Sequence, residues 1–302
     1  MPQSNKASPV SVSIIGVGRL GSALALALET AGYRVEAVVA QRLDKARRTS
    51  RMLDGTPLFL SARQLNRLPD SEVTIISTPD DQIANVAGAL AELNRHTPNR
   101  RVYLHTSGAL SSQALAPLSK KAAAVGSLHP LIAVTQMQKG SQSLRGAFWC
   151  VEGDATAAKV ARRIVEDLDG QSFSIKAHNK PLYHAAAVMV SGHVVALFDL
   201  ALGMLIKSGL SAKRAREILL PLIQSNGRNL VEREPAQALT GSFARGDTAT
   251  IKRHLRALTA SNEKDALAVY RILGKRSLEL AAANKLNKRA LKEIKRLLAE
   301  ED

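Results

Sequence analysis

The stretch "SVSIIGVGRLGSALALAL", residues 11–28, decides the fold. An apolar run breaks at Gly16, Gly18 and Gly21 and then continues as alanines and leucines of helical character. The glycine spacing is G-x-G-x-x-G, and the β-branched run "RVEAVVA" at 34–40 is again typical of a strand. Because strand, glycine turn, helix and strand follow one another, this spacing has the context in which it predicts a dinucleotide-binding site.

The residues of the turn match what such a site needs. Gly16 permits the tight turn, Gly18 lets the backbone approach a pyrophosphate, and Gly21 allows close packing of helix on strand. The helix beginning at Arg19 and Leu20 adds main-chain N–H groups and the positive end of its dipole. We therefore predict these five residues as cofactor-binding. The alternative is a glycine turn that binds no ligand.

Short strand patterns continue along the first half of the chain. They are expected at 72–78, 101–108 and 123–130, with helical segments such as 82–94 between them. Two more strand candidates, at 147–153 and 172–176, flank a helix over 154–168. Strands that alternate with helices predict an α/β fold, a Rossmann-type doubly wound parallel sheet, which we assign to residues 1–176.

From residue 177 the strand patterns disappear and long helical patterns follow. They cover 181–209, 211–232, 247–260 and 263–285, so we predict an all-helical domain over 177–302. The first pattern contains about 25 mostly apolar residues, which is typical of a central helix covered by its neighbours or by a second subunit. The charged, amphipathic tail at 287–302 predicts a solvated surface helix.

The net charge of +16 raises the question of nucleic-acid binding. The excess is spread over the chain, with 21 basic and 14 acidic residues in 1–176 and 21 and 12 in 177–302. Only 3% of residues are aromatic, and no basic block is flanked by stacking aromatics. An anionic cofactor or substrate can be bound without a basic block or stacking aromatic residues. We therefore do not expect a nucleic-acid partner.

The sequence also bears on cellular location. We find no apolar stretch of the roughly 18 to 20 residues that a bilayer requires, and the start "MPQSNKASP" lacks the layout of a signal peptide. The single cysteine, Cys150, cannot form an intrachain disulfide, which agrees with a reducing compartment. We expect a cytoplasmic protein with no membrane partner, in which Cys150 is a small buried strand residue rather than a nucleophile.

The choice of cofactor is read at the end of the second strand, "VVAQRLDKARR" at 38–48. NAD enzymes place a carboxylate at the strand tip to bind the ribose 2′-hydroxyl. Here no carboxylate stands at the tip, Arg42 follows directly, and Arg47 and Arg48 come about a turn later. Since arginine suits a 2′-phosphate, we predict NADP (NADPH) rather than NAD. The alternative is that these arginines form a solvated helix face.

Polar residues at other strand ends are further candidates, because ligands of open α/β sheets bind there. Three of them are predicted to line the nicotinamide ribose side: Ser77, Thr78 and Pro79. Ser107 is expected beside the cofactor toward the substrate, and His129 near the substrate. For His129, and for His105 on the neighbouring strand, the alternative is a structural histidine satisfied by its neighbours. No metal site is predicted.

In the helical domain, "KPLYHAAAVMVSGH" places Lys180 and His184 four residues apart, on one face of a helix. Such a pair in a cleft can hold a carboxylate or donate a proton to a developing alkoxide. A lysine near a helix start is also commonly just solvated, which is the alternative.

Several stretches together resemble a bacterial family that pairs a Rossmann-like domain with the domain of unknown function 2520. They lie at 16–28, 105–112 ("HTSGALSS"), 127–131 ("SLHPL"), 152–154 ("EGD"), 180–197 and 238–247 ("ALTGSFARGD"). This family is kin to deazaflavin-dependent NADP oxidoreductases, pyrroline-5-carboxylate reductase and ketopantoate reductase. The resemblance implies a fold like that of 6-phosphogluconate dehydrogenase and an NADP-dependent reductase of a small carbonyl or imine.

The resemblance also implies partners and roles. It implies a homodimer built through the helical domains, with ketopantoate as one candidate substrate. Related hydroxyacid dehydrogenases carry a lysine and, four residues later, an asparagine, at positions that match Lys180 and His184. We therefore take these two as the catalytic residues.

The sequence departs from the family in two places. Ser191, Gly192 and His193 stand where Ser-Asn-aromatic is usual, so His193 is a candidate substrate contact in place of the amide. Ser242 stands where proline is usual, while Arg245 and Asp247 keep their places. The rival to an enzyme is a non-catalytic NADP-binding dimer that acts as a sensor or binds a partner protein. A Lys180–His184 pair hidden from any ligand would favour the rival.

Overall fold

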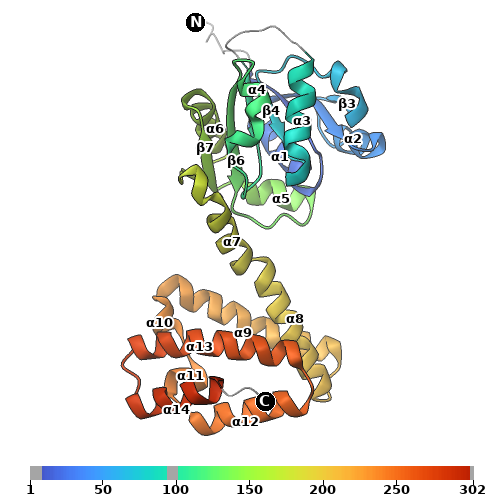
Figure 1. Cartoon of the computed structure of the whole chain (residues 1–302). Helices are drawn as coiled ribbons and strands as arrows, with labels where there is room; N and C mark the ends of the chain where they lie inside the picture. The colour runs from blue at the N-terminus through green and yellow to red at the C-terminus, as the bar shows by residue number, and fades with distance from the viewer. Residues whose placement is uncertain (1–8, 94–100, 300–302) are drawn as a thin grey trace, which may run out of the picture. The chain divides into compact units, whose positions relative to one another are not determined.

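A computed structural model of the chain describes residues 9–93 and 101–299. The contacts divide the chain into two compact units, Met1–Ser191 and Gly192–Asp302 (Figure 1). The sequence-based boundary at Lys176 falls before helix α7 (Lys180–Val190), whereas this division falls after it. The exact domain boundary stays a prediction.

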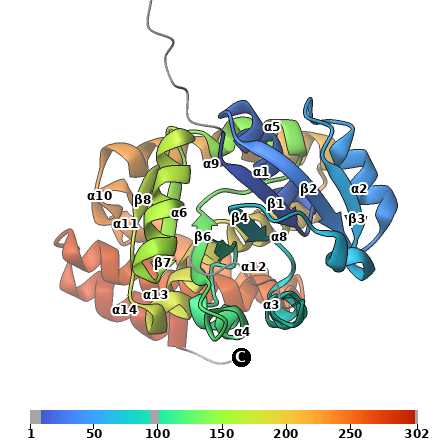
Figure 2. The same ribbon diagram turned by 90° about the horizontal axis from the view of Figure 1, so that it is seen from above.

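The first unit is built on one sheet of eight strands in the order β3-β2-β1-β4-β5-β6-β7-β8 (Figure 2). The strands are β1 (Ser11–Ile15), β2 (Arg34–Ala40), β3 (Leu58–Ser61), β4 (Val73–Ile76), β5 (Val102–His105), β6 (Ala124–Pro130), β7 (Phe148–Gly153) and β8 (Gln171–Phe173). The first six strands are parallel, and the strand order reverses between β1 and β4. This is the switch point of a doubly wound sheet, which confirms the Rossmann-type fold.

Helices cover both faces of this sheet. One face carries α1 (Arg19–Thr30), α5 (Met137–Leu144) and α6 (Ala155–Asp167); the other carries α3 (Asp80–Glu92), the 3-10 turn η2 (Ser112–Leu115) and α4 (Ala116–Ser119). Figure 2 shows α1 and α5 across the sheet from α3 and α4. Neighbouring residues Ile14 and Ile15 belong to different cores, because successive side chains of a strand point to opposite faces. The remaining elements, α2 (Leu43–Ser50) and η1 (Ala62–Arg67), follow β2 and β3.

The far edge of the sheet departs from the predicted parallel arrangement. β7 runs antiparallel to β6, with His129 opposite Cys150, and β8 is parallel to β7. A Cβ on Gly153, whose φ is +146°, would lie 2.5 Å from the Cα of Gly126. Glycine therefore allows the close approach of these two strands. Cys150 is fully buried in β7, as predicted for a small strand residue.

The glycine turn after β1 is held by close backbone packing. A Cβ on Gly16, whose φ is +101°, would lie 2.6 Å from the main chain of Ser77. A Cβ on Gly21 would lie 2.2 Å from the main-chain oxygen of Gly16, whereas one on Gly18 would meet no atom within 4 Å. Gly16 and Gly21 are thus required by packing, and Gly18 leaves open space beside the turn.

The second unit is helical throughout its described residues. Its helices are α8 (Gly192–Lys207), α9 (Ala212–Glu232), α10 (Pro235–Ala238), α11 (Gly241–Arg245), α12 (Thr248–Ala260), α13 (Lys264–Ala283) and α14 (Lys288–Ala299). Its core joins Ile251 of α12, Leu278 of α13 and Ile294 of α14. The tail helix α14, predicted to be a solvated surface helix, keeps a polar exposed face but also buries Leu297 and Leu298. It is therefore part of the core.

The segment Ala177–Lys207, which contains the turn η3 (Ala177–Asn179), α7 and α8, corrects one expectation. By length and composition it is able to cross a membrane, so the statement that no apolar stretch is long enough was wrong. Core helices of soluble proteins pass the same test, but none of the most apolar window of this segment is buried. Leu182, Val190 and Val195 are 69% to 77% exposed. Within the described residues these apolar side chains are left uncovered.

We expect Gly21→Ala to lower the free energy of unfolding by about 1 to 3 kcal/mol, because its Cβ would collide with the Gly16 main chain. Gly18→Ala is the matched control and should leave Tm unchanged. Thermal unfolding of both variants checks this. Equal Tm values for the two would contradict the packing role of Gly21.

Candidate functional site

A cavity of about 550 Å³ lies at the carboxyl ends of β1, β2 and β4. It is lined by Ile15, Gly16, Val17, Gly18, Val39, Ala40, Gln41, Lys45, Ala62, Leu65, Ser77, Thr78, Pro79, Asp81, Gln82 and Val86. Five predicted cofactor residues, from the glycine turn and from the end of β4, are therefore brought together around one space.

Three features of the cavity fit a dinucleotide. Thr78 lines the cavity. Its hydroxyl oxygen, Oγ1, is buried and has no hydrogen-bond partner in the described part of the chain. A bound polar group would supply that partner. The backbone at Gly18 is open to approach. α1 begins at Arg19 without a side-chain cap, so the N–H groups of Arg19 and Leu20 are available to an anion.

The basic residues after β2 are placed differently from one another. Arg42 binds Asp44 with both sides of its guanidinium, Nε to Oδ1 at 3.0 Å and Nη2 to Oδ2 at 2.9 Å. Arg47 lies over the ring of Phe59, and Arg48 is exposed. Lys45, which the sequence analysis did not single out, lines the cavity.

A chain of hydrogen bonds links the cavity wall to the loop after β5. Thr106 Oγ1 donates to Ser77 Oγ at 3.1 Å, and Ser107 Oγ donates to Asp80 Oδ2 at 2.8 Å. The N–H groups of Ala109 and Leu110 in turn donate to Ser107 Oγ. Ser107, predicted beside the cofactor, thus shapes the loop and fixes it to the start of α3.

The loop over 105–112 is held at its other end by two further residues. His105 is fully buried; its Nδ1 accepts from the N–H of Ser107, so its Nε2–H donates to the main-chain oxygen of Ser111 at 3.0 Å. Glu152 accepts from both the N–H and the hydroxyl of Ser112 at 2.8 Å. Both ring nitrogens of His105 thus have protein partners, as the structural alternative expects.

Lys180, at the start of α7, is completely buried. Its ammonium donates to Ser127 Oγ at 2.6 Å and to the main-chain oxygen of Ser107 at 3.2 Å. Within the described residues no carboxylate forms an ion pair with it. Burial lowers the pKa of this lysine, while nearby groups such as Glu152 act in the opposite direction. Lys180 thus joins the ends of β5 and β6 to α7 without facing solvent, and for this residue that is the arrangement that the non-catalytic rival predicts.

Two imidazoles converge on Gly108. A Cβ at this position would lie 2.4 Å from His184 Nδ1 and 2.8 Å from His129 Nε2. The two rings are edge to face with centroids 5.4 Å apart, and His129 Nδ1 is 2.7 Å from the hydroxyl of Tyr183. Only glycine at 108 lets α7 bring both histidines to the loop. The structure therefore groups His129, Lys180 and His184 around 107–108.

The protonation of these histidines follows from their surroundings. Burial, together with the charges of His184 and Lys180, lowers the pKa of His129 to about 4. His184 Nδ1 is buried and, among the described residues, has no partner. The neutral tautomer of His184 that leaves no buried N–H without a partner carries its proton on Nε2. That nitrogen is the one able to donate to a bound molecule.

Other predicted positions lie in the helical unit. His193 is exposed near the start of α8. Asp247 caps α12, accepting from the N–H of Thr250 at 3.0 Å, and Ser242 accepts the N–H of Asp247 with its main-chain oxygen. Arg245 is the last residue of α11. No group of three or more histidine, cysteine or acidic side chains in the described residues is placed to hold a metal.

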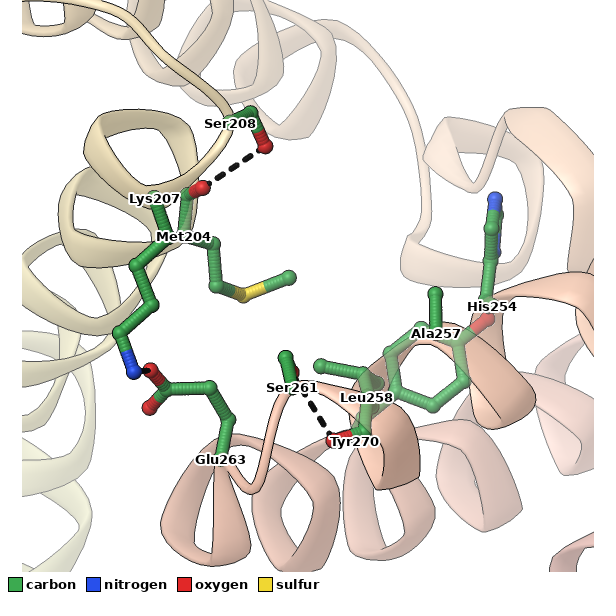
Figure 3. Close-up of a pocket in the computed structure, with 9 residues that line it drawn as sticks. All are labelled: Met204, Lys207, Ser208, His254, Ala257, Leu258, Ser261, Glu263 and Tyr270. Carbon is green, nitrogen blue, oxygen red and sulfur yellow. Dashed lines mark hydrogen bonds and ion pairs between the residues drawn. The ribbon is translucent and has the colours of Figure 1, made fainter.

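A second cavity, of about 400 Å³, lies in the helical unit (Figure 3). It is lined by Met204, Lys207, Ser208, His254, Ala257, Leu258, Ser261, Glu263 and Tyr270. Lys207 pairs with Glu263, and His254 Nδ1 lies 2.9 Å from the Tyr270 hydroxyl. Both serine hydroxyls donate to main-chain oxygens three or four residues earlier. Because these polar groups bond to protein atoms, the first unit holds the stronger candidate site.

Family comparisons agree with this architecture. Residues 2–130 match a Rossmann-like domain, and residues 147–277 match the domain of unknown function DUF2520. The chain carries a Rossmann-like domain followed by a DUF2520 domain. This confirms the resemblance predicted from the sequence. No curated protein matches the chain.

Solved structures share the fold over nearly the whole length. Protein TM1727 from Thermotoga maritima is 22% identical, covers 91% of this chain and 99% of its own, and superposes with a TM-score of 0.69. BF3122 from Bacteroides fragilis, proposed to be an NADP oxidoreductase, is 22% identical, with 90% and 99% covered and a TM-score of 0.73. A pyrroline-5-carboxylate reductase from Coxiella burnetii is 13% identical, with 98% and 100% covered and a TM-score of 0.56.

The lowered pKa values predict how stability depends on pH. Burial holds the pKa of His105 and of His129 near 4, against 6.5 ordinarily, so between these values the unfolded chain binds more protons. Their contribution is complete above about pH 6.5 and is lost as pH falls toward 4. Each histidine should change the free energy of unfolding by up to about 1.4 kcal/mol per pH unit in this window.

His129→Asn tests this contribution. The variant should lose less stability than the wild type between pH 7 and pH 5 in denaturant titrations. His178→Asn, at an exposed position, is the control and should keep the wild-type slope. A wild-type slope in His129→Asn would show that His129 is not held neutral in the folded protein.

Proposed function

We propose that this protein is an NADP-dependent oxidoreductase that reduces a small carbonyl or imine substrate. The observation that carries the proposal is the set of contacts that leads from the cavity of about 550 Å³ to the loop at which His184, the candidate proton donor, lies. It runs from Ser77 through Thr106 and Ser107 to Lys180, with His184 beside Gly108.

The cofactor would be bound by the first unit. The glycine turn and the N–H groups of α1 suit the pyrophosphate, and Thr78 would use its unpartnered hydroxyl. Arg42 and Lys45 at the end of β2 favour a 2′-phosphate, since no carboxylate occupies the strand tip. This supports NADP over NAD. The similar fold of BF3122, proposed to be an NADP oxidoreductase, is consistent with this assignment.

NADPH held in this cavity would be the source of the hydride for the substrate carbon. His184 Nε2–H donates the proton that the substrate oxygen or nitrogen then requires, which is general acid catalysis. Lys180 acts as a positioning residue, because its buried ammonium fixes Ser107 and Ser127 rather than meeting a ligand. His129, held neutral, packs against the ring of His184 and fixes its place.

The substrate class follows from the same groups. A proton donor beside a hydride source suits a carbonyl or an imine, and a ketopantoate-like keto acid is one candidate. The pyrroline-5-carboxylate reductase from Coxiella burnetii shares the fold, which is consistent with an imine. His193 stays a candidate substrate contact.

We also propose a cytoplasmic homodimer formed through the helical unit. The helical unit exposes large apolar side chains on three of its helices: Val195 on α8, Leu222 and Val231 on α9, and Ile272 on α13. Exposed apolar residues thus also occur outside the segment that, among the described residues, is able to span a membrane, which favours a second copy of the chain as their cover.

The function is tested by measuring NADPH oxidation with a panel of 2-keto acids and cyclic imines. At least one compound should be reduced, and NADPH should be preferred to NADH by roughly tenfold, as expected for a charge-assisted phosphate contact. His184→Ala should lower turnover by about 10²- to 10⁴-fold while NADPH affinity stays within about twofold. His178→Ala is the control for a nearby exposed histidine.

Two outcomes contradict parts of this proposal. Full turnover in a folded His184→Ala variant would exclude His184 as the acid. Tight NADPH binding without reduction of any compound would instead support the non-catalytic sensor.

The dimer is tested by sedimentation. The wild type should sediment near 65 kDa, twice its 32.4 kDa chain mass. Val195→Glu, which places a charge on the exposed face of α8, should give a monomer, whereas Met52→Glu, at a partly exposed position of the first unit, should not. A monomeric wild type, or one that is recovered only with lipid vesicles, would contradict the proposed dimer.

A further inference from the structure

In the turn between β2 and α2, the arginine that is predicted to bind phosphate, Arg42, already binds a carboxylate of this chain. Arg42 is the N-cap residue of α2 and has an extended backbone, and Asp44 lies in the first helical turn. The fork of Arg42 closes on the carboxylate of Asp44 through two hydrogen bonds of 3.0 and 2.9 Å. A carboxylate and a phosphate bind arginine through the same bidentate geometry.

The other basic residues of this turn are not equivalent to Arg42. Lys45 lines the cavity together with Gln41, whereas Arg42 is turned toward Asp44. Arg47 is stacked over Phe59. Lys45 is therefore the basic residue of 42–48 that already stands on the cavity wall.

The pair of Arg42 and Asp44 is suited to exchange. The hydrogen bonds from Arg42 lower the pKa of Asp44, so the carboxylate is charged at neutral pH. The side chains of Arg42 and Asp44 are 73% and 61% exposed, so water and salt screen the pair and it is weak. A doubly charged phosphate, with Lys45 beside it, can replace a weakly held carboxylate.

We propose that Asp44 is a specificity-determining residue, an internal competitor that occupies Arg42 until a 2′-phosphate displaces it. Binding of a phosphorylated dinucleotide is then an exchange of anions on Arg42, with Lys45 as a second cation from the cavity wall. A dinucleotide with a free 2′-hydroxyl leaves the pair closed. Asp44 therefore lowers the affinity for NADPH and has little effect on NADH. This inference rests on the proposed dinucleotide site.

If Asp44 competes with the 2′-phosphate, its removal should raise the affinity for NADPH, whereas removal of a residue that binds the cofactor would lower it. Asp44→Asn should tighten NADPH binding by about twofold to fivefold, because an exposed ion pair contributes little more than this. NADH affinity should not change. Lys45→Met should weaken NADPH binding by about fivefold to tenfold and NADH binding much less. In an Arg42→Ala background, Asp44→Asn should have no further effect, since the competitor then has nothing to occupy.

Isothermal titration of the full-length protein with NADPH, NADH, 2′,5′-ADP and 5′-AMP measures these effects without any substrate. Asp54→Asn makes the same charge change at another exposed position, and Arg48→Met removes a basic residue that does not line the cavity. Both controls should bind like the wild type. Thermal unfolding shows whether each variant is folded.

The outcomes separate this inference from the proposed function. Binding of NADPH by the wild type with unchanged or weaker binding by Asp44→Asn would overturn the exchange and leave the dinucleotide site intact. An equal gain in Asp54→Asn would show a general charge effect and would also overturn it. A wild type that binds none of the four nucleotides would overturn both.

Discussion

The buried ammonium of Lys180 is the constraint on which the candidate site depends. A charge removed from water is costly unless hydrogen bonds replace its hydration, and here the acceptors are a serine hydroxyl and a main-chain oxygen rather than a carboxylate. Those acceptors must be held rigidly. Ser107 is fixed by its bond to Asp80 and by the donors of its own loop, so the loop after β5 and the start of α7 depend on each other.

The same constraint explains motifs that look unrelated in the sequence. Glu152 holds Ser112 at the end of the loop. Asp154 caps α6 and accepts the N–H of Val125 at 2.6 Å, which joins β6 to the start of that helix. Gly153 between them lets β7 approach β6 closely. The "EGD" stretch is therefore structural, and it supports the strand whose Ser127 binds Lys180.

The sequence predicted what is local and missed what is made by distant contacts. The glycine turn, most strands and the helices of the second unit follow from short-range patterns. The antiparallel direction of β7 did not, because a buried strand has the same apolar pattern in either direction. The strand β3 was not predicted, because its sequence "LFLS" contains no β-branched residue. The spacing of Lys180 and His184 showed a shared helix face, but the burial of Lys180 depends on Ser127, 53 residues earlier. The Arg42–Asp44 pair is local, two residues apart in "RLD", but the sequence does not show that the two side chains bind each other.

Charge at the carboxyl edge of the sheet unites these observations. The carboxylates near the site already accept hydrogen bonds: Asp80 from Ser107, Glu152 from Ser112 and Asp44 from Arg42. Lys180 forms no ion pair with a carboxylate among the described residues, and Lys45 lies on the cavity wall. These hydrogen bonds leave the carboxylates charged, and Asp81 lies on the cavity wall with Lys45, so the groups that the cavity offers to an anion are Lys45 and the main-chain N–H groups at the uncapped start of α1. The overall excess of basic residues therefore fits an anionic small molecule at this edge without requiring a nucleic-acid surface.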